Sequence, residues 1–79
     1  MSKWHKRLIK KGKLGELSKI QEELDEAIDA EEQGQVLMLL FELSDLVGAC
    51  GLVAKKYGFS LKDLVKFSKL RSKVAKNEK

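Results

Sequence analysis

The chain of 79 residues carries 16 basic and 12 acidic side chains, a formal net charge of +4 and one cysteine. A single domain of this size buries only about 60% of the surface that its unfolded form exposes, so a lone core is marginal. One cysteine excludes an intrachain disulfide, and no Cys/His cluster has the spacing of a structural zinc site. Self-association is therefore the expected source of additional stability.

Residues 1–13 form a basic N-terminal segment. Neither an apolar stretch nor a small-residue cleavage site follows its first basic residues, so it lacks the pattern of a secretory signal, and we expect a cytoplasmic protein. Within this segment His5 is expected at the surface. Trp4 is the aromatic side chain that we expect to stack on a planar group of a bound ligand.

Helix is expected throughout, because proline is absent and Leu, Lys, Glu and Ala are abundant. A first helix is predicted from about Leu14 to Glu32, with apolar residues at helical spacing on one face and charges on the others. Gly34 separates it from the next helix. The predicted apolar stripe consists of Leu17, Ile20, Leu24, Ala27 and Ile28.

A second helix is predicted from about Gln35 to Tyr57, and it is apolar nearly all the way round. It approaches membrane-spanning length, but Glu42 and Asp45 near its middle would each cost roughly 2.5 to 3.5 kcal/mol at a bilayer centre. We therefore expect protein, and no membrane, to cover it. The rest of a single chain is too small to cover this helix on all sides, so we predict a dimer or a dimer of dimers. Buried side chains are expected at Phe41, Cys50 and Phe59.

A third helix is predicted from the capping residue Ser60, with Asp63 completing a capping box, to about Lys76. Gly58 suits the left-handed residue that ends the preceding helix. The third helix is basic along one face, where lysines recur every three or four residues. These lysines are Lys62, Lys66, Lys69, Lys73 and Lys76. The expected fold is thus all-α: a helical hairpin over 14–57 and a basic C-terminal helix over 60–76, within one domain of residues 1–79.

Charge is unevenly distributed along this fold. No Lys or Arg occurs from Gln21 to Ala54, where nine carboxylates fall. An acidic centre between basic arms suits a metal ion that bridges to an anionic ligand. Charge balance between packed helices is the alternative interpretation.

Two acidic motifs lie at equal distances from Gly34. Glu22 to Glu26 reads E-E-x-x-E, and Glu42 to Asp45 reads E-x-x-D. If the helices fold back antiparallel about the glycine, Glu26 comes level with Glu42 at about 12 Å from the turn, and Glu23 comes level with Asp45 at about 16 Å. Converging carboxylates repel unless they are protonated or bridged by a cation, and an all-oxygen set selects a hard ion such as Mg²⁺ or Mn²⁺.

The two motifs differ in how strongly they indicate a site. Taken alone, the first reads as an ordinary charged helix face in water. The second lies on a helix with almost no other polar side chain, which is hard to explain as solvated surface. A di-iron carboxylate bundle is disfavoured, because it needs Glu-x-x-His motifs and His5 is the only histidine.

The two motifs in this order resemble the signature of the MazG-like, all-α nucleoside triphosphate pyrophosphohydrolases, over about Leu14 to Lys73. The resemblance implies hydrolysis of an NTP or dNTP to the monophosphate and pyrophosphate, in a dimer or tetramer. It implies Mg²⁺ ligands at Glu23, Glu26, Glu42 and Asp45. It makes Glu22 a candidate to support the metal ligands without binding the ion itself, or to act as the general base. Glu23 is the other candidate for the general base.

The C-terminal helix is similar to the family's N-x-x-K-L-x-x-R pattern. Lys69 and Leu70 match it, whereas Lys66 replaces the asparagine and Lys73 replaces the arginine. The resemblance implies phosphate contacts from Lys66, Lys69, Arg71 and Lys73. Lysine has donors only, so the hydrogen bonding that an asparagine can provide to base or sugar is changed.

Two other functions are compatible with parts of the sequence. A non-catalytic module that binds nucleic acid or a protein partner through its lysine-rich flanks would explain the basic arms, but not Glu42 and Asp45. A purely structural bundle would use the acids only to set helix register. We expect a nucleotide hydrolase and regard nucleic acid as an unlikely partner.

Overall fold

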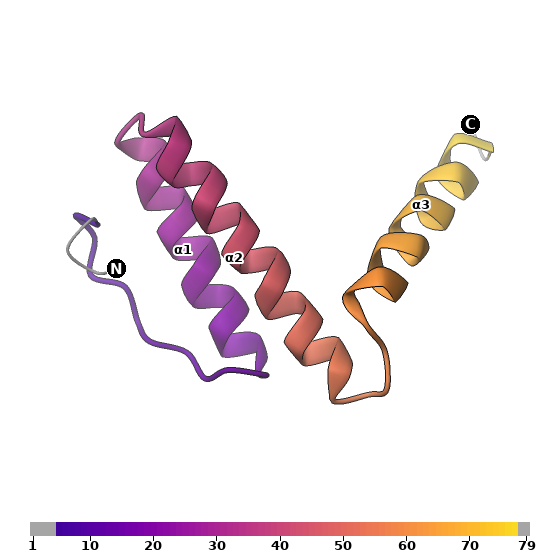
Figure 1. The fold of residues 1–79 in the computed structure, drawn as a ribbon. Helices are drawn as coiled ribbons and strands as arrows, with labels where there is room; N and C mark the ends of the chain where they lie inside the picture. The colour runs from indigo at the N-terminus through magenta and orange to yellow at the C-terminus, as the bar shows by residue number, and fades with distance from the viewer. Residues whose placement is uncertain (1–4, 78–79) are drawn as a thin grey trace.

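The computed structural model describes residues 5–77 of the chain, and this range holds three helices and no strand (Figure 1). They are α1 (Leu17–Glu32), α2 (Val36–Lys55) and α3 (Leu61–Asn77). The predicted all-α fold is confirmed, as is the hairpin made by the first two helices. α1 begins later than predicted because Gly15 has a φ of 82°, a left-handed conformation that a helix does not contain.

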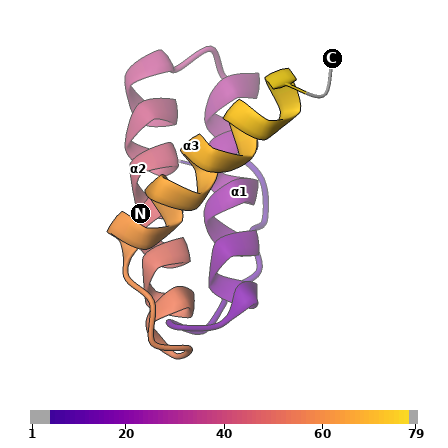
Figure 2. The same ribbon diagram turned by 90° about the vertical axis from the view of Figure 1, so that its right-hand side faces the viewer.

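Glycines end both helices of the hairpin in the same way. Gly34 has a φ of 70°, its N–H donates to the carbonyl of Glu31, and the N–H of Gln35 donates to that of Ala30. Gly58, with a φ of 85°, sits in an equivalent arrangement after α2. Both are Schellman motifs, which satisfy the last carbonyls of a helix and reverse the chain. The first places α1 and α2 side by side and antiparallel (Figures 1 and 2).

α3 is an arm that leaves the hairpin. Its predicted capping box is present: the N–H of Ser60 donates to Asp63 Oδ2 at 2.8 Å, and the N–H of Asp63 donates to Ser60 Oγ at 3.2 Å. Over the described residues α3 packs against α2 and not against α1, and it slopes away from the hairpin in Figure 1. The radius of gyration is accordingly 14.6 Å, against about 12 Å for a compact domain of this length.

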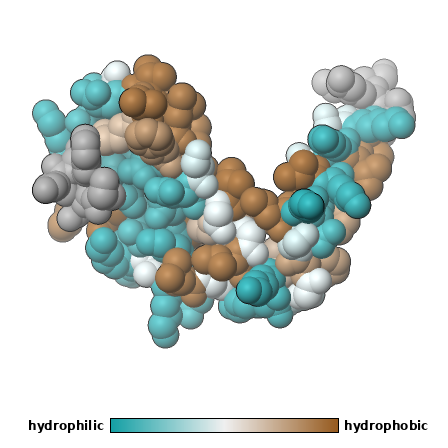
Figure 3. Space-filling view, viewed as in Figure 1, coloured by the Kyte–Doolittle hydropathy of each residue, from teal (hydrophilic) through white to brown (hydrophobic). Residues whose placement is uncertain are grey.

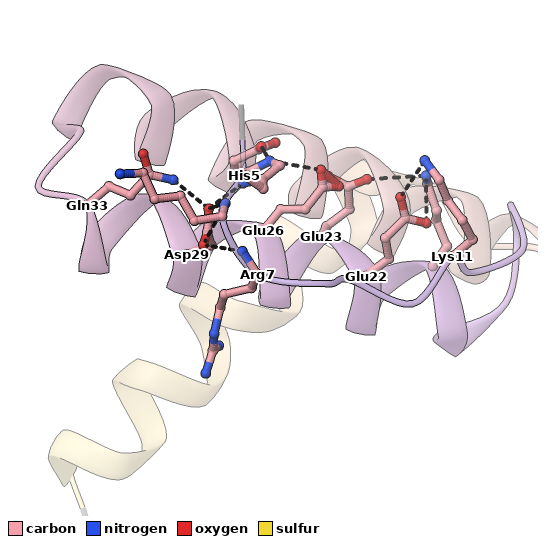
Figure 4. Close-up of polar contacts among 11 residues, drawn as sticks. His5, Arg7, Lys11, Glu22, Glu23, Glu26, Asp29 and Gln33 are labelled. Carbon is pink, nitrogen blue, oxygen red and sulfur yellow. Dashed lines mark hydrogen bonds and ion pairs between the residues drawn. The ribbon is translucent and has the colours of Figure 1, made fainter. Parts of the chain in front are cut away.

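The buried face of α1 is mostly acidic, so the predicted apolar stripe is buried only in part. Leu17 is 71% exposed and Leu24 is 41% exposed, whereas Ala27 of the stripe is buried. The buried side chains of α1 are Glu22, Glu23, Glu26, Ala27, Asp29 and Ala30. The physical reason is that residues 5–13 of the N-terminal segment lie along α1 and cover its carboxylates with main-chain and basic groups (Figure 4).

α2 keeps most of its apolar surface uncovered within the single chain. Phe41 is 60% exposed and Phe59 is 48% exposed, so the prediction that they are core residues fails for an isolated chain, although Phe59 packs edge-to-face on Phe67. By length and composition alone α2 could also cross a membrane. The hydrophobic surface in Figure 3 lines the hollow between the hairpin and α3.

Two glycines give a matched test of this packing. A Cβ on Gly12 would collide with the carbonyl group of Ser18, whereas a Cβ on Gly48 would meet no atom of the described residues within 4 Å. We expect Gly12→Ala to lift the N-terminal segment from α1 and to lower the free energy of unfolding by about 1–3 kcal/mol. Gly48→Ala should raise it by up to about 1 kcal/mol, since alanine favours a helix interior. Urea denaturation measures both, and equal effects of the two substitutions would contradict the packing.

Candidate metal centre

The hairpin brings the acids of both motifs together at the levels that their spacing from Gly34 predicts. Potential ligand atoms of Glu23, Glu42 and Asp45 lie within 4.8 Å of one another. Those of Glu22, Glu23 and Glu26 form a second such group. All four residues predicted as metal ligands therefore belong to one connected cluster, with Glu23 common to both groups.

Most of this cluster is buried. Glu22, Glu23, Glu26 and Glu42 are each less than a tenth exposed, while Asp45 lies at the exposed edge. The interpretation of the first motif as a solvated helix face is therefore wrong. Its carboxylates face α2 and the N-terminal segment instead.

Burial and mutual repulsion make three of these acids harder to ionise. Burial raises the pKa of Glu23, with a further contribution from the charge of Glu26. Burial likewise raises the pKa of Glu26, next to Glu42. The pKa of Glu42 is also raised by burial, although its hydrogen bond with His5 opposes the shift. A cation among these groups would relieve both causes.

Glu23 has one buried oxygen that stands out. The residue is 5% exposed, and its Oε2 has no hydrogen-bond partner within the described part of the chain. Its other oxygen, Oε1, lies 3.3 Å from Lys19 Nζ. An unpaired buried carboxylate oxygen costs free energy, and such an atom in a cluster of acids is the kind of ligand that a metal ion satisfies.

Glu22 is in a different electrostatic position. Its Oε1 accepts hydrogen bonds from the N–H of Gly12 at 2.8 Å and from Lys19 Nζ at 3.1 Å, while Oε2 lies 3.8 Å from Lys11 Nζ. Burial opposes its ionisation, but these donors outweigh burial and lower its pKa. Glu22 is thus an ionised anchor for the N-terminal segment.

His5 is not at the surface as predicted. Its side chain is 1% exposed and lies over the acid cluster (Figure 4). Nδ1 is 2.8 Å from Asp29 Oδ2, and Nε2 is 2.7 Å from Glu42 Oε2 and 3.3 Å from Glu26 Oε2. Burial alone would lower the pKa of His5, but the hydrogen bonds with Asp29 and Glu42 dominate and raise it.

Asp29 holds this histidine and was missed by the sequence reasoning. It is 1% exposed, and besides His5 it accepts the main-chain N–H groups of Lys6 and Arg7 and the side-chain amide of Gln33. These donors outweigh burial and lower its pKa. Its position three residues after Glu26 continues the same helical face, which was the available signal. No signal in the sequence indicated the contact between Asp29 and His5, because it joins residues 24 apart in the sequence.

The predicted phosphate ligands lie elsewhere. Lys66, Lys69, Arg71 and Lys73 are exposed on α3, and no hydrogen bond or ion pair joins them to the acid cluster within residues 5–77. Trp4 lies outside the described residues. The structure therefore assembles the predicted acids without bringing the predicted cations of α3 to them.

Comparison of the chain with family models, curated proteins and solved structures finds no match.

These pKa shifts predict an unusual dependence of stability on pH. Glu23, Glu26, Glu42 and His5 hold protons more tightly in the folded chain, so their contribution to stability falls as the pH rises from the ordinary pKa values of 4.5 for glutamate and 6.5 for histidine through the raised pKa values. Asp29 has a lowered pKa and contributes above the ordinary aspartate pKa of 3.8, losing this contribution only as the pH falls through its folded pKa.

We therefore expect the metal-free protein, kept in EDTA, to be more stable at about pH 5 than at about pH 8. Denaturant unfolding at the two pH values measures the difference, and His5→Gln should remove the part that arises above neutrality. A stability that increases over this range would contradict the charge arrangement.

Proposed function

We propose that the chain is a Mg²⁺-dependent nucleoside triphosphate pyrophosphohydrolase, which converts an NTP or dNTP to the monophosphate and pyrophosphate in the cytoplasm. The observation that carries the proposal is the convergence of the buried Glu23, Glu26 and Glu42 and the exposed Asp45 from two helices, with one oxygen of Glu23 unpaired among the described residues. The reaction itself comes from the resemblance of these motifs to the MazG-like enzymes.

The donor set fits a hard divalent cation, because all four side chains offer carboxylate oxygens, and the exposed Asp45 leaves one side open to a ligand. When bound there, Mg²⁺ supplies positive charge to the phosphate oxygens of the triphosphate. Glu23, with its unpaired oxygen and raised pKa, is the better candidate to accept a proton from the attacking water. Glu22 is less suited as the base, because Gly12 and Lys19 donate to one of its oxygens and the lowered pKa makes it a weaker proton acceptor.

A cavity beside the acids supports a nucleotide as the substrate. It has a volume of about 400 Å³, within the range of small-molecule sites, and includes Glu42 and Asp45 in its lining. Leu37, Met38 and Phe41 provide its apolar wall. A triphosphate directed at the carboxylate cluster would place its base against this wall, where Phe41 offers an aromatic face.

We further propose that the active form is a homo-oligomer, a dimer or tetramer. The chain exposes 6432 Å², whereas a compact monomer of 8.9 kDa exposes about 4800 Å². Apolar side chains on all three helices account for much of this surface. Since α3 does not deliver its cations to the acids of its own chain, Lys69 and Lys73 would contact phosphates from a neighbouring copy.

The hydrolase proposal is tested with Glu42→Gln. This change keeps the size of the side chain but removes a charge at the centre of the cluster, so Mg²⁺-dependent pyrophosphate release from a panel of NTPs and dNTPs should fall by about 100-fold or more. Glu31→Gln, an exposed acid of α1, is the matched control and should retain full activity.

Retained activity in Glu42→Gln would refute the proposed centre. Absence of pyrophosphate release from the wild-type chain with every nucleotide, together with tight binding of nucleic acid, would instead favour a basic binding module, for which the exposed cations of α3 are the supporting feature.

The oligomer is tested by sedimentation and by thermal unfolding over an about fifty-fold range of protein concentration. A midpoint that rises with concentration and a mass of two or four chains are expected, because association stabilises the folded form by mass action. A monomer with an invariant midpoint would contradict the proposal. Recovery of the protein only in membranes or detergent would show that α2 is covered by lipid rather than by another chain.

A further inference from the structure

The arrangement of His5 has a feature that the proposed hydrolase does not use. Asp29 receives hydrogen bonds from the N–H groups of Lys6 and Arg7 and from Gln33, and with this many donors around it the carboxylate acts as an acceptor. The imidazole must then donate from Nδ1 to Asp29. Its Nε2 is left facing the carboxylates of Glu26 and Glu42.

The carboxylates of Glu26 and Glu42 need a positive charge at Nε2. In the metal-free chain a proton on Nε2 supplies it and is donated to Glu42 Oε2 at 2.7 Å, with Glu26 Oε2 at 3.3 Å. A divalent ion that replaces this proton would have the imidazole nitrogen and two carboxylate oxygens within reach as ligands. Neighbouring ligands of an octahedral ion lie about 3 Å apart when the metal–ligand bonds are about 2.1 Å. The two distances from Nε2 are therefore close to the separation of neighbouring ligands around one ion, and all three ligand atoms lie within 4.8 Å of one another.

The surroundings are those of a metal-binding histidine. In such sites the second ring nitrogen donates to a carboxylate, which fixes the tautomer and the orientation of the ring. Asp29, 1% exposed, occupies this position. A cavity of about 160 Å³, lined in part by His5, Glu22 and Glu26, leaves room for water molecules to complete the coordination.

Glu23 supplies an independent indication of a missing ligand. Its carboxylate belongs to groups with Glu26 and with Glu42, the two acids that face His5, and its Oε2 is buried without a partner in the described residues. The cluster thus continues from the imidazole to an oxygen that no donor in this part of the chain satisfies.

We infer that His5, Glu26 and Glu42 form a binding site for a divalent transition-metal ion such as Mn²⁺. Imidazole nitrogen favours first-row transition metals, while Mg²⁺ takes oxygen ligands almost exclusively, so this site differs in selectivity from the oxygen-only group of Glu23, Glu42 and Asp45. Glu42 is common to these two groups and would bridge two ions, and Glu26, also one of the four acids proposed for Mg²⁺, lies between the two sites. The inference rests on the proposed function for the catalytic use of such an ion, but ion binding is measured without nucleotide.

The experiment uses the untagged full chain, stripped of metal and titrated with Mn²⁺. Pulsed electron paramagnetic resonance detects hyperfine coupling between Mn²⁺ and a coordinated imidazole nitrogen. Because His5 is the only histidine, growth on ¹⁵N-histidine should replace the ¹⁴N coupling by that of ¹⁵N without any change to the protein. Bound Mn²⁺ without nitrogen coupling, a coupling unaffected by the label, or no bound Mn²⁺ would each overturn the inference.

The Mn²⁺ affinity of three variants tests the site quantitatively. His5→Gln should abolish the nitrogen coupling and weaken Mn²⁺ binding by about tenfold or more, whereas Asp29→Asn should keep the coupling and weaken binding by about tenfold, because it loosens the orientation of the ring. Lys10→Gln, an exposed position in the same segment, is the control and should bind as the wild type does. Unchanged affinity in His5→Gln would refute the site.

The two proposals fail in different ways. Nitrogen-coordinated Mn²⁺ in a chain that releases no pyrophosphate from any nucleotide supports the His5 site and removes the hydrolase. Mg²⁺-dependent pyrophosphate release with only oxygen ligands on Mn²⁺ supports the hydrolase and removes the His5 site.

Discussion

The burial of carboxylates between two helices is the constraint on which the rest of the structure depends. Acids withdrawn from water must be protonated, hydrogen-bonded or paired with positive charge. The chain meets this need unevenly. Glu22 and Asp29 have donors from the N-terminal segment, and their pKa values fall. Glu23, Glu26 and Glu42 have too few, and their pKa values rise. We assign these three acids, together with the exposed Asp45, to metal ions.

The hairpin and the meeting of its acids could be predicted from the sequence because local rules decide them. Gly34 and Gly58 end helices through their backbone conformation, Ser60 and Asp63 cap α3, and equal spacing about Gly34 sets the level of Glu26 and Glu42. Each of these features involves residues close in sequence or a regular helical rise. The outcome did not depend on knowing the tertiary packing.

Two of the failed predictions have a common physical origin in the N-terminal segment. A single histidine among lysines carries no periodic signal, so neither the burial of His5 nor its contact with Asp29 could be predicted. The same omission explains the wrong face of α1: Leu17 and Leu24 match an apolar stripe, but the segment covers the opposite face. For Phe41 and Phe59 the expectation of burial concerned an assembly, and one chain does not supply the partner surface.

The N-terminal segment and α1 differ in how they would tolerate a change of length. Between its anchors at His5 and Gly12 the segment is irregular, and an extended chain of this many residues can span more than 20 Å, whereas Glu22 and Asp29 are about 10 Å apart along the helix axis. The segment is longer than the distance it has to span, so it can accommodate one inserted or deleted residue without moving its anchors. In α1 a single insertion between Glu23 and Glu26 would rotate the acids on either side of it by about 100° relative to each other and divide the row. Over evolution, length variation is therefore expected in the segment and not in the helix.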